Sequence, residues 1–197
     1  MLFPDHRCLG ALGLAMLALT GLPPEAKADG IYYQLDYVPS ATSTVLTVQR
    51  GSLGVSLGWS EWDTGEATTL FASYSLPVPA LGPGTTLKLG PAFRHEGGGP
   101  SQAGVRAVIE TYRQTDQGSL FLLGDVTSIK REYLFLAEWG LPDSPVSLAV
   151  SFQGDDGDFS EQTLTLGYQI PDSPLRLRLG HRFDADKTFV GFSINTF

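Results

Sequence analysis

The sequence has a single cysteine, Cys8, which lies close to the N-terminus. A chain with one cysteine cannot build a framework of internal disulfides, so packing or paired backbone hydrogen bonds must stabilise the fold. After residue 28 no run reaches the roughly 18 apolar residues that a membrane-spanning helix needs. Basic residues are also scarce, since 13 Lys and Arg face 21 Asp and Glu and give a net charge of -8. This acidic balance argues against nucleic acid as a partner.

The first 28 residues have the three parts of a secretory signal peptide. Arg7 forms a short basic region, residues 9–22 are apolar, and Ala26 and Ala28 form a small-residue cleavage site. Cys8 lies before the apolar stretch rather than at the cleavage site, which is not the arrangement of a lipoprotein. We therefore expect residues 1–28 to be removed on export, and residues 29–197 to form one domain.

Beyond the signal peptide, apolar and polar residues alternate in short segments that Gly, Pro, Asp and Ser clusters interrupt. A period of two residues is typical of β-strands with two different faces. The pattern predicts twelve strands, at about residues 30–38, 43–50, 52–62, 68–76, 85–94, 104–113, 119–127, 131–140, 146–153, 161–170, 175–183 and 188–197. Ten strands is the fallback count.

The stretch "LRLRLGHR" at residues 175–182 shows the two faces most clearly. Leu175, Leu177 and Leu179 share one face, and arginines share the other. The remaining strands follow the same rule, with Leu, Val, Phe and Tyr on one side and small, hydroxyl or charged residues on the other. The pattern predicts that one side of the sheet contacts lipid and the other side is enclosed.

The connections between strands fall into two chemical classes. Those after even-numbered strands are tight and rich in Pro, as in the repeated "PDSP" at 142–145 and 171–174. Several of those after odd-numbered strands are polar and acidic, as in "GDDGDFSE" and "DADK". We expect short turns on one side of a membrane and longer acidic loops on the other.

Aromatic residues of the apolar face gather near the strand ends, where rings prefer the membrane interface. The predicted interface residues are Tyr33, Tyr37, Trp59, Tyr74, Phe93, Tyr133, Trp139, Phe152, Tyr168 and Phe183.

Together these features resemble the bacterial outer-membrane β-barrel proteins, in particular small porin-like barrels. The resemblance rests on the export signal, the amphipathic strands and a last strand "TFVGFSINTF" that ends on Phe197. It implies an antiparallel up-and-down transmembrane barrel in the outer membrane of a Gram-negative cell, surrounded by lipids that include lipopolysaccharide. It also implies that Phe197 belongs to the signal read by the barrel assembly machinery. One departure is that Val190, Phe192 and Ile194 have the opposite parity to Phe197.

A secreted soluble β-sandwich is the alternative fold, because its strands also alternate and its turns also carry Gly and Pro. It would bury the apolar face between two sheets. The aromatic rows and the two connection classes favour the barrel.

Ten charged residues share the enclosed face of the predicted barrel and are expected to line its lumen: Asp36, Lys88, Arg94, Arg106, Glu110, Asp125, Glu138, Arg176, Arg178 and Arg182. An arginine on the lipid side at the bilayer midplane would cost roughly 2 to 4 kcal/mol. The bases could form the anion-attracting wall of a narrow diffusion channel for a small solute. Alternatively, the four acids could neutralise them in an internal network.

Catalytic and metal-binding signals are weak. His95 and His181 are the histidines beyond the signal peptide, and neither sits in a recognisable nucleophile and base arrangement. The "GDDGDFSE" loop lacks the spacing of an EF-hand. We expect no catalytic residue, metal or cofactor. Two further functions stay open: a closed barrel that supports envelope or exopolysaccharide assembly, and an enzyme that modifies outer-leaflet lipid.

Overall fold

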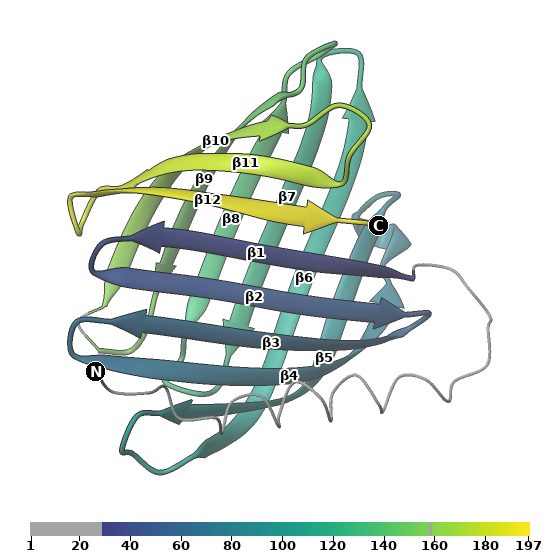
Figure 1. Ribbon diagram of the computed structural model, residues 1–197. Helices are drawn as coiled ribbons and strands as arrows, with labels where there is room; N and C mark the ends of the chain where they lie inside the picture. The colour runs from purple at the N-terminus through teal and green to yellow at the C-terminus, as the bar shows by residue number, and fades with distance from the viewer. Residues whose placement is uncertain (1–28, 158) are drawn as a thin grey trace.

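The computed structural model describes residues 29–157 and 159–197, in which twelve antiparallel strands form one closed barrel (Figure 1). The predicted signal peptide, residues 1–28, lies outside the described part of the chain. Within that part, no helix has the length and apolar character needed to cross a membrane. The predicted all-β barrel, with each strand next to its neighbours in sequence, is confirmed.

The strand ends agree with the predicted ones to within three residues. The strands are β1 (Gly30–Val38), β2 (Ala41–Arg50), β3 (Leu53–Trp62), β4 (Gly65–Pro77), β5 (Thr85–Glu96), β6 (Gln102–Thr115), β7 (Gly118–Thr127), β8 (Tyr133–Gly140), β9 (Val146–Gly154), β10 (Ser160–Gln169), β11 (Leu175–Arg182) and β12 (Lys187–Asn195). A short 3-10 helix, η1 (Pro79–Leu81), lies between β4 and β5.

Closure comes from β1, which pairs with β2 on one side and with β12 on the other. In the β1–β12 ladder Tyr32 lies opposite Asn195 and Tyr37 opposite Val190. Every strand therefore has two hydrogen-bonded neighbours and the sheet has no free edge. The alternative of a soluble β-sandwich is wrong, because two separate sheets would each keep two edges.

Glycine permits a close backbone approach in the middle of the β4–β5 ladder. Phe71 pairs with Ala92 and Tyr74 with Leu89, but the two positions between them on each strand are not paired. Pro91 has no N–H group to donate there. A side chain at Gly90 would collide with the backbone oxygen of Ala72. Only a glycine fits at that point of the wall.

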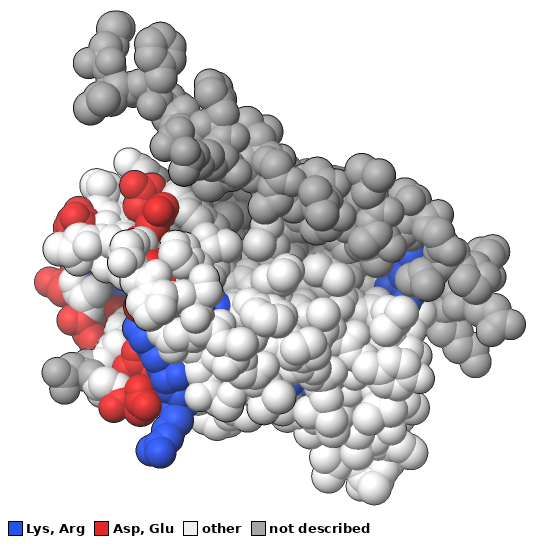
Figure 2. Space-filling view, turned by 90° about the horizontal axis from the view of Figure 1, so that it is seen from below, with Lys and Arg blue, Asp and Glu red and all other residues white. Residues whose placement is uncertain are grey.

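The two faces of the strands point where the alternation predicts. Leu177 and Leu179 are 48% and 49% exposed on the outer surface. The side chain of Arg178, which lies between them, is only 12% exposed. Figure 2 shows the same contrast, since the visible middle of the barrel wall carries almost no charged side chains. The outer surface is therefore an apolar band around an enclosed polar interior.

Charge separates the two ends of the barrel. Acidic residues gather at the end where the odd-numbered strands finish, which we call the acidic end (Figure 2). Connections at this end carry Asp63, Glu132, Asp155, Asp156, Asp184 and Asp186. Both the start of β1 and the end of β12 lie at the opposite end (Figure 1).

The predicted difference in connection length is wrong. The longest connection, residues 78–84, lies at the opposite end, and the connections 39–40 and 63–64 at the acidic end have two residues each. Loop composition, not loop length, distinguishes the two ends.

The repeated "PDSP" segments form the same turn twice. Asp143 and Asp172 have positive φ angles of 51° and 56°, a conformation that aspartate tolerates better than most residues. In each turn the next serine accepts a hydrogen bond from the backbone N–H two residues later, at 3.2 Å for Ser144 and 3.1 Å for Ser173. The sequence repeat thus builds matching reversals at the opposite end.

The C-terminus resolves the parity conflict in the last strand. The β12 strand ends at Asn195, so Phe197 is not part of the ladder and needs no bulge to reconcile it with Val190. Its ring lies against the backbone of Gly30, where a side chain would collide with it. The ring itself remains exposed.

Candidate functional site

The ten charged residues predicted to line the lumen all lie on the less exposed face of the barrel wall, and nine of them form ion pairs. Four pairs join predicted residues to each other: Asp36–Arg178, Lys88–Glu110, Arg106–Asp125 and Glu138–Arg176. Arg94 pairs with Glu96 and Glu132. The interior is therefore a network of paired charges more than a bare basic wall.

The Asp36–Arg178 pair is the most enclosed of these. The Arg178 guanidinium donates to Asp36 through Nε at 2.9 Å and Nη2 at 3.2 Å, and the Asp36 side chain is only 6% exposed. Gln34 donates a further hydrogen bond to the Asp36 carboxylate at 2.7 Å and accepts one from Tyr32. These three β1 residues alternate with apolar ones, so strand parity brings them to one face.

The Arg106–Asp125 pair connects β6 to β7 in the interior. Arg106 Nε donates to both carboxylate oxygens of Asp125, at 2.8 and 3.0 Å. The guanidinium also lies 5.0 Å from the ring centroid of Phe71, within the range of a cation–π interaction. The same ring belongs to a buried apolar cluster, so charged and apolar groups share this part of the lumen.

At the opposite end the interior opens into a cavity of about 360 Å³. Its lining includes Gln114, Ser119, Glu138, Ser147, Gln169 and Arg176. Arg176 pairs with Glu138 and also donates to the Gln169 side chain at 3.4 Å. Lys88 and Glu110 pair at 2.6 Å across β5 and β6. This mouth is polar and bears charges of both signs.

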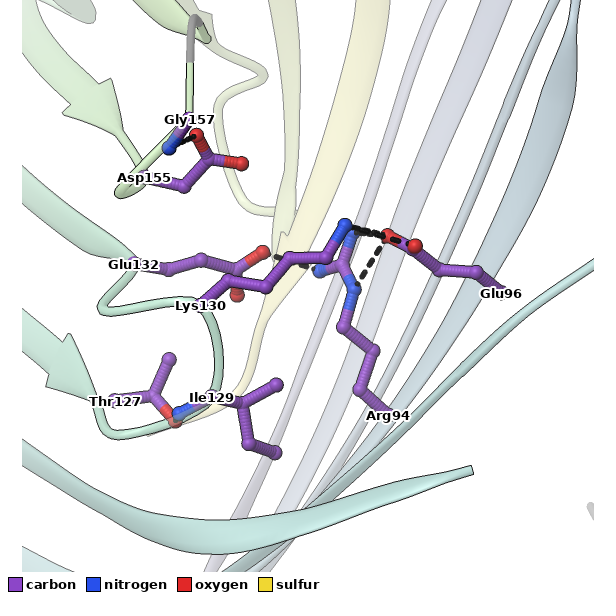
Figure 3. A network of polar contacts seen from close by, with 8 residues as sticks. All are labelled: Arg94, Glu96, Thr127, Ile129, Lys130, Glu132, Asp155 and Gly157. Carbon is purple, nitrogen blue, oxygen red and sulfur yellow. Dashed lines mark hydrogen bonds and ion pairs between the residues drawn. The ribbon is translucent and has the colours of Figure 1, made fainter. Parts of the chain in front are cut away.

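At the acidic end a second network surrounds Arg94 (Figure 3). Its guanidinium contacts Glu96 at 2.8 Å and Glu132 at 2.6 Å. Lys130 also contacts Glu96, at 2.6 Å. Sequence reasoning missed the two acidic partners of Arg94 and the Lys130 that shares Glu96 with it. Glu96 has the parity of Arg94 but lies beyond the predicted end of its strand, and the other two lie in a connection.

Burial raises the pKa of the Glu132 carboxyl above its ordinary value. The positive charges of Arg94, Lys130 and Arg106 act in the other direction, and the negative charge of Asp155 adds to the rise. Glu132 therefore takes up a proton at a higher pH than an exposed glutamate does.

Arg182 is the exception among the ten predicted residues. Within the described part of the chain it has no carboxylate partner, and its guanidinium lies 5.7 Å from the ring centroid of Phe189. The guanidinium of Arg178 lies 6.0 Å from the centroid of the same Phe189 ring. Among the described residues, Arg182 is thus the one base of the predicted set without an ion pair.

The predicted interface aromatics lie in two rows on the outer surface. Toward the acidic end are Tyr37, Trp59, Phe93, Tyr133, Phe152 and Phe183, and toward the opposite end are Tyr33, Tyr74, Trp139 and Tyr168. Most of these rings are exposed, whereas Tyr33 and Trp59 are half-buried. The apolar band lies between the two rows.

The histidines form only loose polar contacts on the outside. His181 Nδ1 lies 3.2 Å from Thr188 Oγ1, and its Nε2 lies 3.7 Å from Asp186. The Asp186 side chain is 95% exposed, unlike the buried acid that orients a catalytic histidine. His95 lies 3.3 Å from the Ser101 hydroxyl on an exposed surface. Within the described residues, no cluster of three His, Cys, Asp or Glu could hold a metal.

Comparison with known proteins connects this geometry to small porins. No protein-family model and no curated protein matches the chain. A solved KdgM porin is 13% identical with a TM-score of 0.53, and the match covers 84% of this chain and 98% of that one. The fold resembles that of a small porin.

Two more solved structures give the same picture. A KdgM porin in complex with disordered oligogalacturonate is 12% identical, with a TM-score of 0.54 and coverage of 84% of this chain and 98% of the porin. A NanC porin is 11% identical, with a TM-score of 0.50 and coverage of 85% and 98%. At these identities the likeness shows a shared fold.

Proposed function

We propose that this protein is an outer-membrane β-barrel that acts as a narrow diffusion channel for small solutes. The closed barrel with an apolar outside and a charged inside is the observation that supports it most strongly. In a bilayer every backbone polar group needs a partner, and a closed barrel meets that need. Charged side chains are costly in contact with lipid, whereas charges enclosed by the barrel suit a hydrated path for solutes.

The solute class follows from the balance of charges along the path. Arg182 offers an unpaired guanidinium, and Arg94, Arg106 and Arg178 add bases whose charge is shared with acids. Such a wall admits small anions without holding them tightly. The likeness to a porin solved with oligogalacturonate supports acidic saccharides as the first solutes to test.

A closed barrel that supports envelope assembly is the second candidate. Ion pairs and the apolar cluster around Phe71 fill part of the interior, which is what a sealed barrel needs. A folded barrel that shows no conductance in planar bilayers would favour this role. We propose no enzymatic role, because His181 lacks a buried acid.

Three further expectations belong to this proposal. The acidic end faces the outside of the cell. Outer-membrane lipids, including lipopolysaccharide, surround the apolar band. The barrel assembly machinery reads the C-terminal segment with Phe197.

Planar-bilayer recordings of the purified barrel, residues 29–197, test the channel. We expect discrete conductance steps, and a reversal potential in a salt gradient that shifts toward cations in Arg182→Glu. The matched control is Arg113→Glu, which makes the same charge change at an exposed side chain that donates to the Leu81 carbonyl. No conductance above bare lipid would overturn the proposal. An equal shift in both variants would remove Arg182 from the path.

A further inference from the structure

The connection between β7 and β8, residues 128–132, folds into the barrel instead of standing above its rim. Its Ile129 is 6% exposed and packs in one buried cluster with Phe71, Ala92 and Val108. These partners are the enclosed residues of β4, β5 and β6. Among the described residues, Ile129 is the only buried apolar residue that lies between strands. An isoleucine from a loop therefore occupies space inside the lumen.

The registers of the β4–β5 and β5–β6 ladders show how far this residue reaches into the barrel. Phe71 pairs with Ala92, and Ala92 pairs with Gly104, so these three residues share one level of the wall. A Cβ at Gly104 would lie 2.8 Å from Ile129 Cγ1, which places Ile129 against that level. Phe71 is the central residue of the thirteen in β4. The same level is only the third residue of β6, so Ile129 lies just inside the rim at β6 and level with the middle of β4.

The loop is held on three sides. Toward β6, the Ser128 N–H donates to the Val105 carbonyl at 2.9 Å and the Ser128 hydroxyl accepts from the Val105 N–H at 3.0 Å. Toward the β9–β10 connection, the Lys130 carbonyl accepts from the Asp156 N–H at 2.8 Å.

On the far side of β6, β5 supplies the third anchor (Figure 3). Lys130 reaches Glu96 at 2.6 Å, and Glu132 reaches Arg94 at the same distance. The loop supplies a base and then an acid, Lys130 and Glu132, and β5 supplies the matching acid and base, so two ion pairs form side by side. They connect the loop to a strand that pairs with neither β7 nor β8.

The backbone angles of residues 130 and 131 indicate that tertiary contacts impose the shape of the loop. Lys130 and Arg131 have φ angles of 51° and 47°. Residues with long side chains rarely adopt this left-handed region, and two in succession are rarer still. Neither residue is Gly, Asn or Asp, so the anchors and not local preference hold the turn.

We propose that residues 128–132 form a fixed constriction that sets the size limit of the channel at its acidic end. The inference rests on the proposed channel function and adds the element that determines which solutes fit. Ile129 fills one side of the lumen, while Lys130 and Glu132 present both signs of charge to a passing solute. Small hydrophilic solutes pass, and those wider than the remaining gap are excluded.

A labelling experiment tests the position of the loop without any conductance. Residues 29–197 contain no cysteine, so Ile129→Cys introduces a single thiol, and it is compared with Asp63→Cys at an exposed turn of the same end. In the detergent-solubilised protein without residues 1–28, a membrane-impermeant maleimide should react with Ile129→Cys at least about 10-fold more slowly. Adding Lys130→Ala and Glu132→Ala should raise that rate. Equal rates at positions 129 and 63 would overturn the constriction.

A conductance experiment then tests its role. In the triple variant Ile129→Ala/Lys130→Ala/Glu132→Ala, we expect single-channel conductance to rise about twofold, and larger polyethylene glycols to enter the pore. The control is Asp63→Ala/Thr64→Ala in the β3–β4 turn, which should keep the wild-type polymer cut-off. Heat-modifiable migration on gels checks that each variant is folded. A folded triple variant with the wild-type cut-off would contradict the proposal.

The two readouts separate the possible failures. If labelling shows a protected Ile129 and both wild type and triple variant are silent, the channel function fails and the constriction fails with it. If the wild type is silent and the triple variant conducts, the proposed channel function of the wild type fails, and the loop is the element that closes the barrel rather than one that sets a size limit. Unprotected labelling in a conducting wild type removes the constriction and leaves the channel.

Discussion

Removing Asp36 should destabilise the barrel strongly, because it leaves Arg178 charged in an enclosed site. The two side chains are 6% and 12% exposed and share two hydrogen bonds. Breaking such a buried pair by deleting one partner costs about 3 to 5 kcal/mol. The remaining 12% exposure of Arg178 places the expected loss of unfolding free energy for Asp36→Leu near the lower limit, about 3 kcal/mol.

Urea unfolding in lipid vesicles, followed by tryptophan fluorescence, measures this loss. The double variant Asp36→Leu/Arg178→Leu should recover much of it, because no unpaired charge remains. Asp186→Asn is the matched control, since its carboxylate is 95% exposed and should leave the midpoint unchanged. If Asp36→Leu unfolds at the wild-type urea concentration, or if the double variant is no more stable than the single one, the enclosed pair is not what the structure indicates.

Three further predictions concern the wall and its acidic end. Leu179→Arg, between the two aromatic rows, should lower the unfolding free energy in vesicles by about 2 to 4 kcal/mol, and equal stability would contradict its contact with lipid. Gly90→Ala should cost about 1 to 3 kcal/mol, because the new methyl group collides with the Ala72 carbonyl, and a wild-type urea midpoint would refute that. The raised pKa of Glu132 predicts that its ion pair with Arg94 loses charge, as pH falls, above the ordinary glutamate pKa of about 4.3. Conductance recorded against pH should show a step there that Glu132→Gln lacks, and the same step in both would exclude Glu132.

The strands could be predicted from the sequence because each face has one environment. In "LRLRLGHR" the alternation alone places Leu177 outside and Arg178 inside, and both positions are as predicted. The predicted end of β5 at residue 94 is two residues short of the observed end at Glu96. The residues that follow are a histidine, Glu96 and three glycines, and they do not continue the alternation of apolar and polar residues. Alternation does not show where a ladder stops once the strand leaves the apolar band.

Strand parity alone could not predict which charged residues pair with each other. Sequence alternation puts Asp36 and Arg178 on one face, but the two lie on β1 and β11, with β12 between them. Their contact depends on the register of both ladders, which is not encoded locally. The sequence therefore left both an anion-attracting wall and a neutral network open, with the network slightly favoured, and the structure shows mostly paired charges.

The β7–β8 connection was the least predictable part. Residues 131 and 132 were assigned to a strand, whereas β8 begins at Tyr133. Left-handed Lys130 and Arg131 carry no turn signal, since glycine, asparagine and aspartate are the usual residues there. The tertiary contacts of Ile129 determine the shape of the loop.

The lipid-facing assignment can be tested most directly by a spin-label scan of residues 163–168 on β10 in lipid vesicles. Leu164 and Leu166 are exposed outside, and Thr165 is buried inside. Collision rates with oxygen, which concentrates in the acyl chains, should peak at 164, 166 and 168 and fall at 163, 165 and 167. Rates without that two-residue period, or with the opposite phase, would contradict the barrel orientation on which the channel depends.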